Sequence, residues 1–281
     1  MWTRLALVAL ISSTAAAIAE AGGPEAGASS SKLIVRDERT VEVNGASETW
    51  RLEWAKPPGP VCAPDDAGWF TCPCHGFEFG EEGELDLVRV RTGDETERLH
   101  LTPLFDRSET PPPASERKHA ALRGRPVLAS DFDAWEKADL ARSSSFEDSV
   151  MKRAPLFILE LRDFNRDGWA TEFVLQIGNL PCGKRESVIV GISPKHPRLH
   201  VFGSAEHPDQ PLVLFVELWE ALQGSNGSLR IVSWTCGDHA SEVQQEITLT
   251  VDKLGIHAVR ESFSCDEPAK EHGRLLSREV L

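Results

Sequence analysis

Short runs of β-branched and apolar residues, bounded by Gly, Pro and Asn, dominate the chain after residue 31. Such runs predict strands, because successive side chains of a strand point to opposite faces of a sheet. The predicted strands are 33–35, 40–43, 49–54, 85–90, 98–104, 155–161, 171–177, 187–192, 198–202, 229–234, 246–251 and 256–263. Between the second and third of these, Asn44-Gly45 indicates a tight hairpin.

Few segments have the period of a helix. Residues 132–141 are predicted as a helix with Asp131 as its N-cap, and 145–152 as a short helix opened by a capping box. The Pro and Gly that flank 212–222 favour a helix there, although 212–216 alone would suit a buried strand. Strands outnumber crossover helices, so we predict a mainly β (α+β) fold of antiparallel sheets with a few short helices.

A polar stretch divides the chain. Residues 106–128 include Pro111-Pro112-Pro113 and several charges, which is typical of a linker or a long loop. This predicts an N-terminal β-rich, cysteine-containing region over 32–105 and a C-terminal β-rich domain over 129–281. At this stage the two regions fit either one domain or two.

The N-terminus has the organisation of a secretory signal peptide, with a positive residue, an apolar run and then small residues. These parts are Arg4, residues 5–11, and Ala17, Ala19 and Ala21. A membrane anchor is the alternative, but a spanning helix needs about 20 apolar residues and this run is shorter. We therefore predict a signal peptide over 1–21, a flexible leader over 22–31, and a secreted or periplasmic mature chain without a transmembrane anchor.

The charge of the chain limits its partners. The formal net charge is −14, and cleavage after Ala21 leaves it unchanged because the removed segment holds one Arg and one Glu. Nucleic acids and anionic membrane surfaces attract basic proteins. The sequence therefore predicts no nucleic-acid partner, and leaves an unknown ligand or protein as the partner.

All six cysteines lie in the mature part, at Cys62, Cys72, Cys74, Cys182, Cys236 and Cys265. An even number in an oxidising compartment predicts disulfides. Three lie close together near the N-terminus and three in the C-terminal part, so purely local pairing leaves one cysteine over in each group. We favour Cys62 with Cys72 or Cys74, and Cys236 with Cys265.

The segment 163–169, Asp-Phe-Asn-Arg-Asp-Gly-Trp, carries the clearest chemical signal. Calcium takes several oxygen ligands around one point, and alternate oxygen side chains followed by a Gly turn and a backbone carbonyl provide them. The predicted ligands are the side chains of Asp163, Asn165 and Asp167, the carbonyl of Trp169, and Glu172 to close the shell. An acidic β-turn without metal is the alternative, because Asp, Asn and Gly also populate turns.

Residues 161–174, LRDFNRDGWATEFV, resemble the calcium loop of FG-GAP and VCBS-type β-propeller repeats. In those repeats the loop joins two antiparallel strands of a blade, which implies strands over 156–161 and 172–177 here. The repeat usually has Asp at the ninth loop position, where this chain has Thr171, with Glu172 next. The loop occurs once and spans about fifteen residues, so a complete propeller is not predicted. The twelfth position of an EF-hand needs a carboxylate, and here it is Val174.

A second motif, Cys72-Pro73-Cys74-His75, resembles the second ligand box of Rieske iron–sulfur proteins. A Rieske centre needs two Cys and two His, and no histidine precedes His75 in the chain. The cluster is therefore incomplete. A zinc site using Cys62 with these residues suits the ligand types, but disulfides fit an exported chain better.

Sequence patterns of common catalytic sites are missing. The chain has no Gly-x-Ser-x-Gly elbow, no His-Glu-x-x-His and no phosphate-binding loop. His196 and His200 are separated by Pro197 and do not share a helical face. The segment 236–239, Cys-Gly-Asp-His, has the residue types of a nucleophile and its base, but Cys236 has oxidised partners available. We predict a binding or envelope-associated protein with a structural calcium loop; the alternative is an extracytoplasmic hydrolase without a recognisable motif.

Overall fold

A computed structural model describes ten stretches of the chain, and everything below concerns them. They are residues 34–61, 76–77, 79–91, 93, 95–108, 119–128, 130–131, 144–180, 183–266 and 273–281. The chain divides into two units, Met1–Lys32 and Leu33–Leu281, and all described residues belong to the second. The predicted signal peptide, the flexible leader and the 132–141 helix lie outside the described residues.

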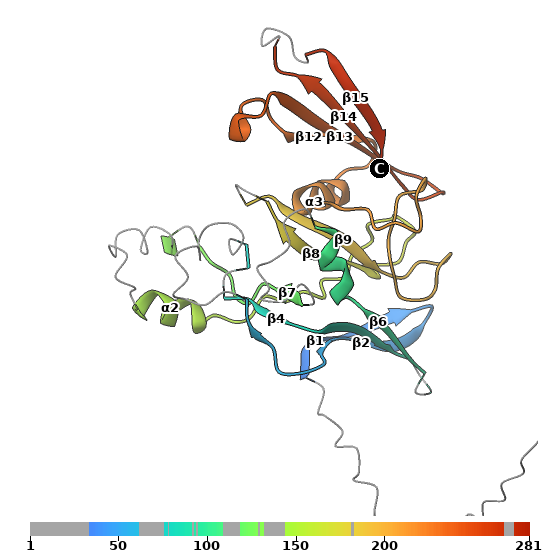
Figure 1. The fold of residues 1–281 in the computed structure, drawn as a ribbon. Coiled ribbons are helices and arrows are strands. Elements are labelled where there is room, and N and C mark those ends of the chain that lie inside the picture. The colour runs from blue at the N-terminus through green and yellow to red at the C-terminus, as the bar shows by residue number, and fades with distance from the viewer. Residues whose placement is uncertain are drawn as a thin grey trace, which may run out of the picture. The chain divides into compact units, whose positions relative to one another are not determined.

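The described strands form four antiparallel sheets, without a closed barrel or a propeller, which confirms the predicted fold class (Figure 1). The first sheet has the order β1-β2-β5-β6, formed by Ile34–Val43, Ala46–Trp54, Leu85–Val90 and Thr96–His100. A small sheet has the order β3-β4-β7, formed by Gly59–Pro60, Glu81–Gly83 and Ala120–Leu122.

Two further sheets make up the rest of the described strands. In one, β9 (Arg185–Gly191) lies between β10 (His200–Val201) and β11 (Leu214–Phe215) and also pairs with β8 (Glu172–Asn179). The other has the order β12-β13-β14-β15, formed by Leu229–Trp234, Val243–Val251, Ile256–Ser264 and Leu275–Val280. The helices are η1 (Thr102–Arg107), α2 (Ser144–Met151), α3 (Val216–Gly224) and η3 (Asp238–Ala240). No helix in this part of the chain is both long and apolar enough to cross a membrane.

The first hairpin confirms its sequence signal. Asn44 and Gly45 both have positive φ, 52° and 76°, as a type I′ turn requires. The turn sets the register in which Val43 lies opposite Ala46. That register places the side chains of Trp50 and Leu52 in the core, where both are fully buried.

Strand β9 is the centre of the hydrophobic core, because residues 186–191 are all buried. Val188 and Val190 belong to a first cluster, which also includes Trp50 of β2, Leu87 of β5 and Phe173 of β8. Ile189 points the other way, into a second cluster formed with α3 and the β12–β15 sheet. The first cluster therefore contains residues from both sides of the predicted linker, and β7, within 106–128, is buried in it.

The predicted strand over 155–161 is wrong, although the chain is extended there. These residues join no ladder, and only Arg162 forms an isolated bridge, to Glu172. A side chain replaces the neighbouring strand: the Asp37 carboxylate accepts hydrogen bonds from the backbone N–H groups of Ile158 and Leu159. The amides are thus satisfied without a partner strand.

Other elements also differ from the prediction, and the short strands β3, β4 and β7 were not predicted. The strand expected over 98–104 ends at His100, and η1 begins at Thr102 with Pro103 in its first turn. The segment 212–222 combines both alternatives, because β11 precedes a helix that starts only at Val216. Strand β15 was not predicted at all: its residues are all exposed, so they show no alternation between apolar and polar faces.

Candidate metal centre

The loop 163–171 is closed at its base by two backbone hydrogen bonds. Arg162 N donates to Glu172 O at 2.7 Å, and Glu172 N donates to Arg162 O at 3.1 Å. Inside the loop, Arg166 and Gly168 have positive φ, 57° and 92°. The sharp reversal at Gly168 is the one expected from the sequence, since glycine adopts this conformation without steric cost.

The carboxylate of Asp163 caps the turn. Its Oδ1 accepts a hydrogen bond from Asp167 N at 3.0 Å, and its Oδ2 accepts one from Gly168 N at 3.0 Å. Asp167 repeats the arrangement one step later, because its Oδ1 accepts a hydrogen bond from Trp169 N at 2.8 Å. Two of the predicted ligands are thus held by the backbone of the loop they enclose.

Asn165 links the two aspartates. Its Oδ1 accepts a hydrogen bond from Asp167 N at 2.9 Å, and its Nδ2 donates to Asp167 Oδ2 at 2.7 Å. Asp163, Asn165, Asp167 and the amide of Trp169 therefore form one hydrogen-bonded group. Bound calcium would take the Asn165 oxygen as a ligand, since a cation is coordinated by the carbonyl end of an amide.

Glu172 is the fully buried member of the set, with 0% of its surface exposed. Its Oε2 accepts a hydrogen bond from Phe164 N at 2.9 Å, and its Oε1 accepts one from Thr171 Oγ1 at 3.1 Å. Burial is the main cause that raises the pKa of the Glu172 carboxyl to about 8. The hydrogen bonds from Phe164 N and Thr171 Oγ1 lower this pKa, and the negative charges of Asp167 and Asp163 raise it by less than the hydrogen bonds lower it.

The two arginines of the loop do not neutralise these carboxylates. Arg166 donates hydrogen bonds to the carbonyls of Leu222 and Ser225, at 2.9 and 2.6 Å. Arg162 pairs with Glu160 and Gln223. In the described part of the chain, no cationic side chain is bound to Asp163, Asp167 or Glu172.

The oxygen set fits calcium by its chemistry. Each carboxylate oxygen named above accepts one hydrogen bond and so keeps a further lone pair for coordination. Among the described residues, no group of three or more His, Cys, Asp or Glu side chains is placed to hold a metal ion, so Asp163, Asp167 and Glu172 do not form such a group. The calcium ligands predicted from the sequence stay a prediction.

Two aromatic side chains fix the loop to the core. Phe164 is 3% exposed and lies edge-to-face against Trp219 of α3, with 6.4 Å between ring centroids. Trp169, at the other end of the loop, packs against the first hydrophobic cluster. The sequence analysis did not predict that Phe164 packs in the core. The only signal for it was an apolar residue between the polar residues of the Asp-x-Asn loop.

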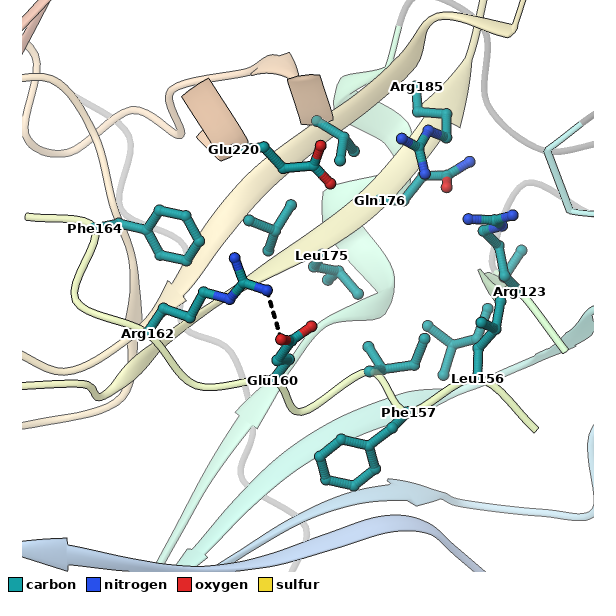
Figure 2. A pocket seen from close by; sticks show the side chains of 15 residues that line it. Arg123, Leu156, Phe157, Glu160, Arg162, Phe164, Leu175, Gln176, Arg185 and Glu220 are labelled. Carbon is teal, nitrogen blue, oxygen red and sulfur yellow. Dashed lines mark hydrogen bonds and ion pairs between the residues drawn. The ribbon is translucent and has the colours of Figure 1, made fainter. Parts of the chain in front are cut away.

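A pocket of about 180 Å³ lies beside the loop, with Phe164 and Arg162 among its lining residues (Figure 2). Its lining is mainly apolar, and its charged members are Arg123, Arg162, Arg185, Glu160 and Glu220. Figure 2 shows the Arg162–Glu160 ion pair beside Phe164. The loop therefore contributes directly to a cavity.

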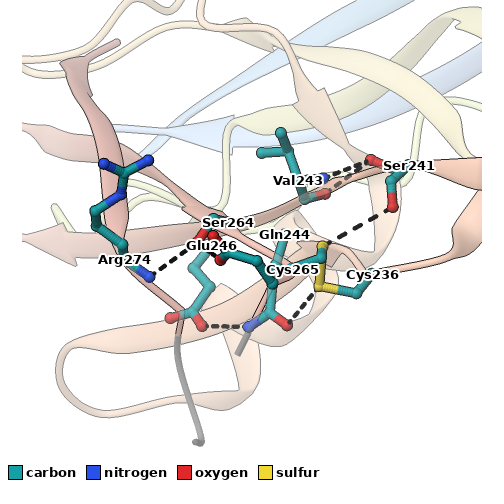
Figure 3. Close-up of a disulfide and its surroundings, with 9 residues drawn as sticks. Cys236, Ser241, Val243, Gln244, Glu246, Ser264, Cys265 and Arg274 are labelled. Atoms are coloured by element: carbon teal, nitrogen blue, oxygen red, sulfur yellow. Dashed lines mark hydrogen bonds between the residues drawn. A yellow bond between two sulfur atoms is a disulfide. The ribbon is translucent and has the colours of Figure 1, made fainter. Parts of the chain in front are cut away.

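The predicted pairing of Cys236 with Cys265 is confirmed (Figure 3). The two Cα atoms are 5.7 Å apart, a normal disulfide separation. The bond excludes Cys236 as the nucleophile of the 236–239 motif. Four cysteines and the Rieske-like motif lie outside the described residues, at Cys62, Cys72, Cys74, Cys182 and His75.

The two neighbouring histidines are a packing feature. The rings of His196 and His200 have centroids 5.3 Å apart, and His200 lies 4.3 Å from the ring of Phe202. Burial lowers the pKa of His200, which keeps its imidazole neutral.

Comparison with known proteins adds no assignment: no family model, no curated protein and no solved structure matches the chain.

Proposed function

We propose that the protein is an exported binding protein whose loop 163–172 is held in shape by calcium. The carrying observation is Glu172, a fully buried carboxylate next to the negative charges of Asp163 and Asp167. Burial raises the pKa of this carboxyl, and a bound cation would hold it in the charged form, because a buried charge in a protein is normally paired or bound to a metal. Because the cationic side chains of the loop are bound elsewhere, a divalent cation is the partner that fits.

Each predicted residue has a role in this site. Asp163, Asn165 and Asp167 would supply side-chain oxygens, Trp169 its carbonyl, and Glu172 the carboxylate that closes the shell. The ion would cancel the repulsion among the carboxylates. It would add stability by binding the folded loop and not the unfolded chain.

Export supports the choice of calcium over other cations. The signal-like N-terminus is consistent with a secreted or periplasmic location, and the Cys236–Cys265 disulfide is typical of an oxidising compartment. Extracellular calcium sites have dissociation constants of about 10⁻⁴ to 10⁻³ M, so a loop that binds calcium weakly is sufficient there.

The pocket beside the loop favours binding over hydrolysis. Its walls are mainly apolar, and Glu160, one of its two carboxylates, is paired with Arg162. A hydrolytic carboxylate pair needs two groups that face a substrate. The loop would therefore act as a structural support for a ligand cavity, by fixing Phe164 in its wall.

Terbium luminescence tests the site, because Trp169 lies inside the loop and sensitises bound Tb³⁺. We expect emission that calcium displaces, and a loss of affinity of about tenfold or more in Asp167→Asn, which removes one ligand charge. The matched control is Asp209→Asn, an exposed aspartate outside the loop. Equal emission from both variants would overturn the site.

A further inference from the structure

A second cavity lies between the β9–β11 strands and the β12–β15 sheet. It encloses about 330 Å³, which is within the size range of small-molecule sites. Its lining combines apolar and polar groups, among them Arg107, Glu186, Phe215, Trp234, Ile247 and Arg260. Neither the calcium loop nor the pocket of Figure 2 shares a lining residue with it.

One face of the β12–β15 sheet changes character at this cavity. Register places Leu249 opposite Ala258, and both side chains are fully buried. Two residues further along the same face, Ile247 lies opposite Arg260. The apolar face that packs on α3 thus continues into a charged position that lines the cavity.

Arg260 is not satisfied by its neighbours. Its Nε is buried and has no hydrogen-bond partner among the described residues. Its guanidinium contacts Glu279 only through Nη1, at 3.5 Å, the long limit of a hydrogen bond. The Arg260 side chain is 34% exposed, so its Nη groups are the donors that a ligand in the cavity can reach.

The charges of the lining favour an anion. Arg107, at the end of η1, is exposed and forms no hydrogen bond or ion pair with any residue in the described ranges. Glu186 is the acidic lining group, and it already accepts a hydrogen bond from Ser108 Oγ. The lining itself therefore holds two arginines and one glutamate, and Glu279, which contacts Arg260 at 3.5 Å, is not a lining residue.

We propose that this cavity binds a small organic acid. The acid group, a carboxylate or a sulfonate, would bind Arg260 and Arg107, since guanidinium recognises planar or tetrahedral oxyanions with two parallel hydrogen bonds. A compact apolar body would lie against Phe215, Trp234 and Ile247. The inference rests on the binding role proposed above and names the ligand class, but the site itself is independent of calcium.

The test uses two dyes of similar shape on the full mature chain. The anionic 8-anilinonaphthalene-1-sulfonate should bind at one saturable site, and Arg260→Gln should weaken it about tenfold or more. The uncharged N-phenyl-1-naphthylamine should bind both proteins equally. The matched control is Arg278→Gln on exposed β15, which removes the same charge and should leave both dyes unaffected.

Equal binding of the anionic dye by Arg260→Gln and Arg278→Gln, or no saturable binding by the wild type, would overturn the proposal. Arg107→Gln provides a second variant if Arg260→Gln does not fold, because Arg107 is exposed and should weaken the anionic dye in the same direction. Each titration is repeated in EDTA and in calcium. If the dye binds but calcium does not change stability, only the proposed calcium site in loop 163–172 is contradicted. If calcium raises stability but the dye does not bind, only the proposed acid site is contradicted.

Discussion

At the scale of single residues, Glu172 combines two unfavourable conditions. Its carboxylate is fully buried, and it lies near the negative charges of Asp163 and Asp167. Hydrogen bonds from Phe164 N and Thr171 Oγ1 offset only part of the cost. A residue of this kind lowers the free energy of unfolding of the metal-free protein. A bound cation would offset this loss.

Glu172→Gln should therefore stabilise the protein without metal and abolish the effect of calcium. The amide keeps an acceptor for Phe164 N and removes a carboxyl whose pKa burial raises to about 8, so we expect a gain on the order of 2 kcal/mol in EDTA. Chemical denaturation measures it, and Glu220→Gln, at an exposed position of α3, is the control. A destabilised variant that still responds to calcium would contradict the role of Glu172.

The loop could be located from the sequence, but the environment of its residues could not. Alternating oxygens in 163–167 and the glycine at Gly168 follow from local spacing. The burial of Glu172 depends on β8 and β9, which pair over a long range. Arg166 does not pair with the carboxylates because its guanidinium donates hydrogen bonds to the carbonyls of Leu222 and Ser225 at the end of α3.

At the scale of elements, the segment 155–161 is held by side chains of β1. Asp37 is 5% exposed and accepts two backbone hydrogen bonds from this segment, while Arg36 donates to the carbonyl of Leu156 at 3.0 Å. Periodicity alone predicted a strand, because it reports alternating burial and not what satisfies the backbone. The hairpin at Asn44-Gly45, in contrast, was set by local φ preferences and was predicted correctly.

Asp37→Ala should release this segment and cost about 2–3 kcal/mol, because it leaves buried backbone donors unpaired. Urea denaturation measures the loss, and backbone hydrogen exchange should show faster exchange at Ile158 and Leu159. Glu38→Ala, an exposed neighbour that pairs with Arg51, is the control and should cost less than about 1 kcal/mol. Similar costs for the two variants would contradict this account of the segment.

His257 at the start of β14 contacts Glu206 and Asp252, and these contacts make the free energy of unfolding depend on pH. Its Nδ1 lies 2.6 Å from Glu206 Oε1 and its Nε2 3.0 Å from Asp252 Oδ1, and these carboxylates raise its pKa. His207 is another histidine near Glu206. A raised pKa means that the contribution is complete below the ordinary value near 6.5 and is lost as pH rises through the folded value.

The unfolding free energy of the wild type should therefore fall by up to about 1 kcal/mol as pH rises above 6.5. The expected change is small because His257 and its two carboxylate partners are partly exposed. His257→Gln should remove this component of the pH dependence. Denaturation series at several pH values measure it, and His100→Gln, at an exposed ion pair on β6, is the control. If the unfolding free energy of His257→Gln depends on pH as in the wild type, the contacts of His257 do not cause the pH dependence.

At the scale of the whole molecule, the mainly β antiparallel fold followed from the sequence, and the cavities did not. Short apolar runs and turn residues reported the strands, since both signals are local. The cavity at Arg260 joins η1, β9, β11 and the β12–β15 sheet, which are far apart in the chain. Contacts over such separations leave no pattern in a single sequence.

The central claim is that calcium binds the folded loop and holds it. The direct measurement is the thermal unfolding temperature of the mature chain in EDTA and in calcium, with magnesium at equal ionic strength as the control. At a hundredfold excess over Kd, calcium should raise the temperature by roughly 5–10 °C in the wild type and not in Glu172→Gln. Equal unfolding temperatures of the wild type in EDTA and in calcium would contradict the account.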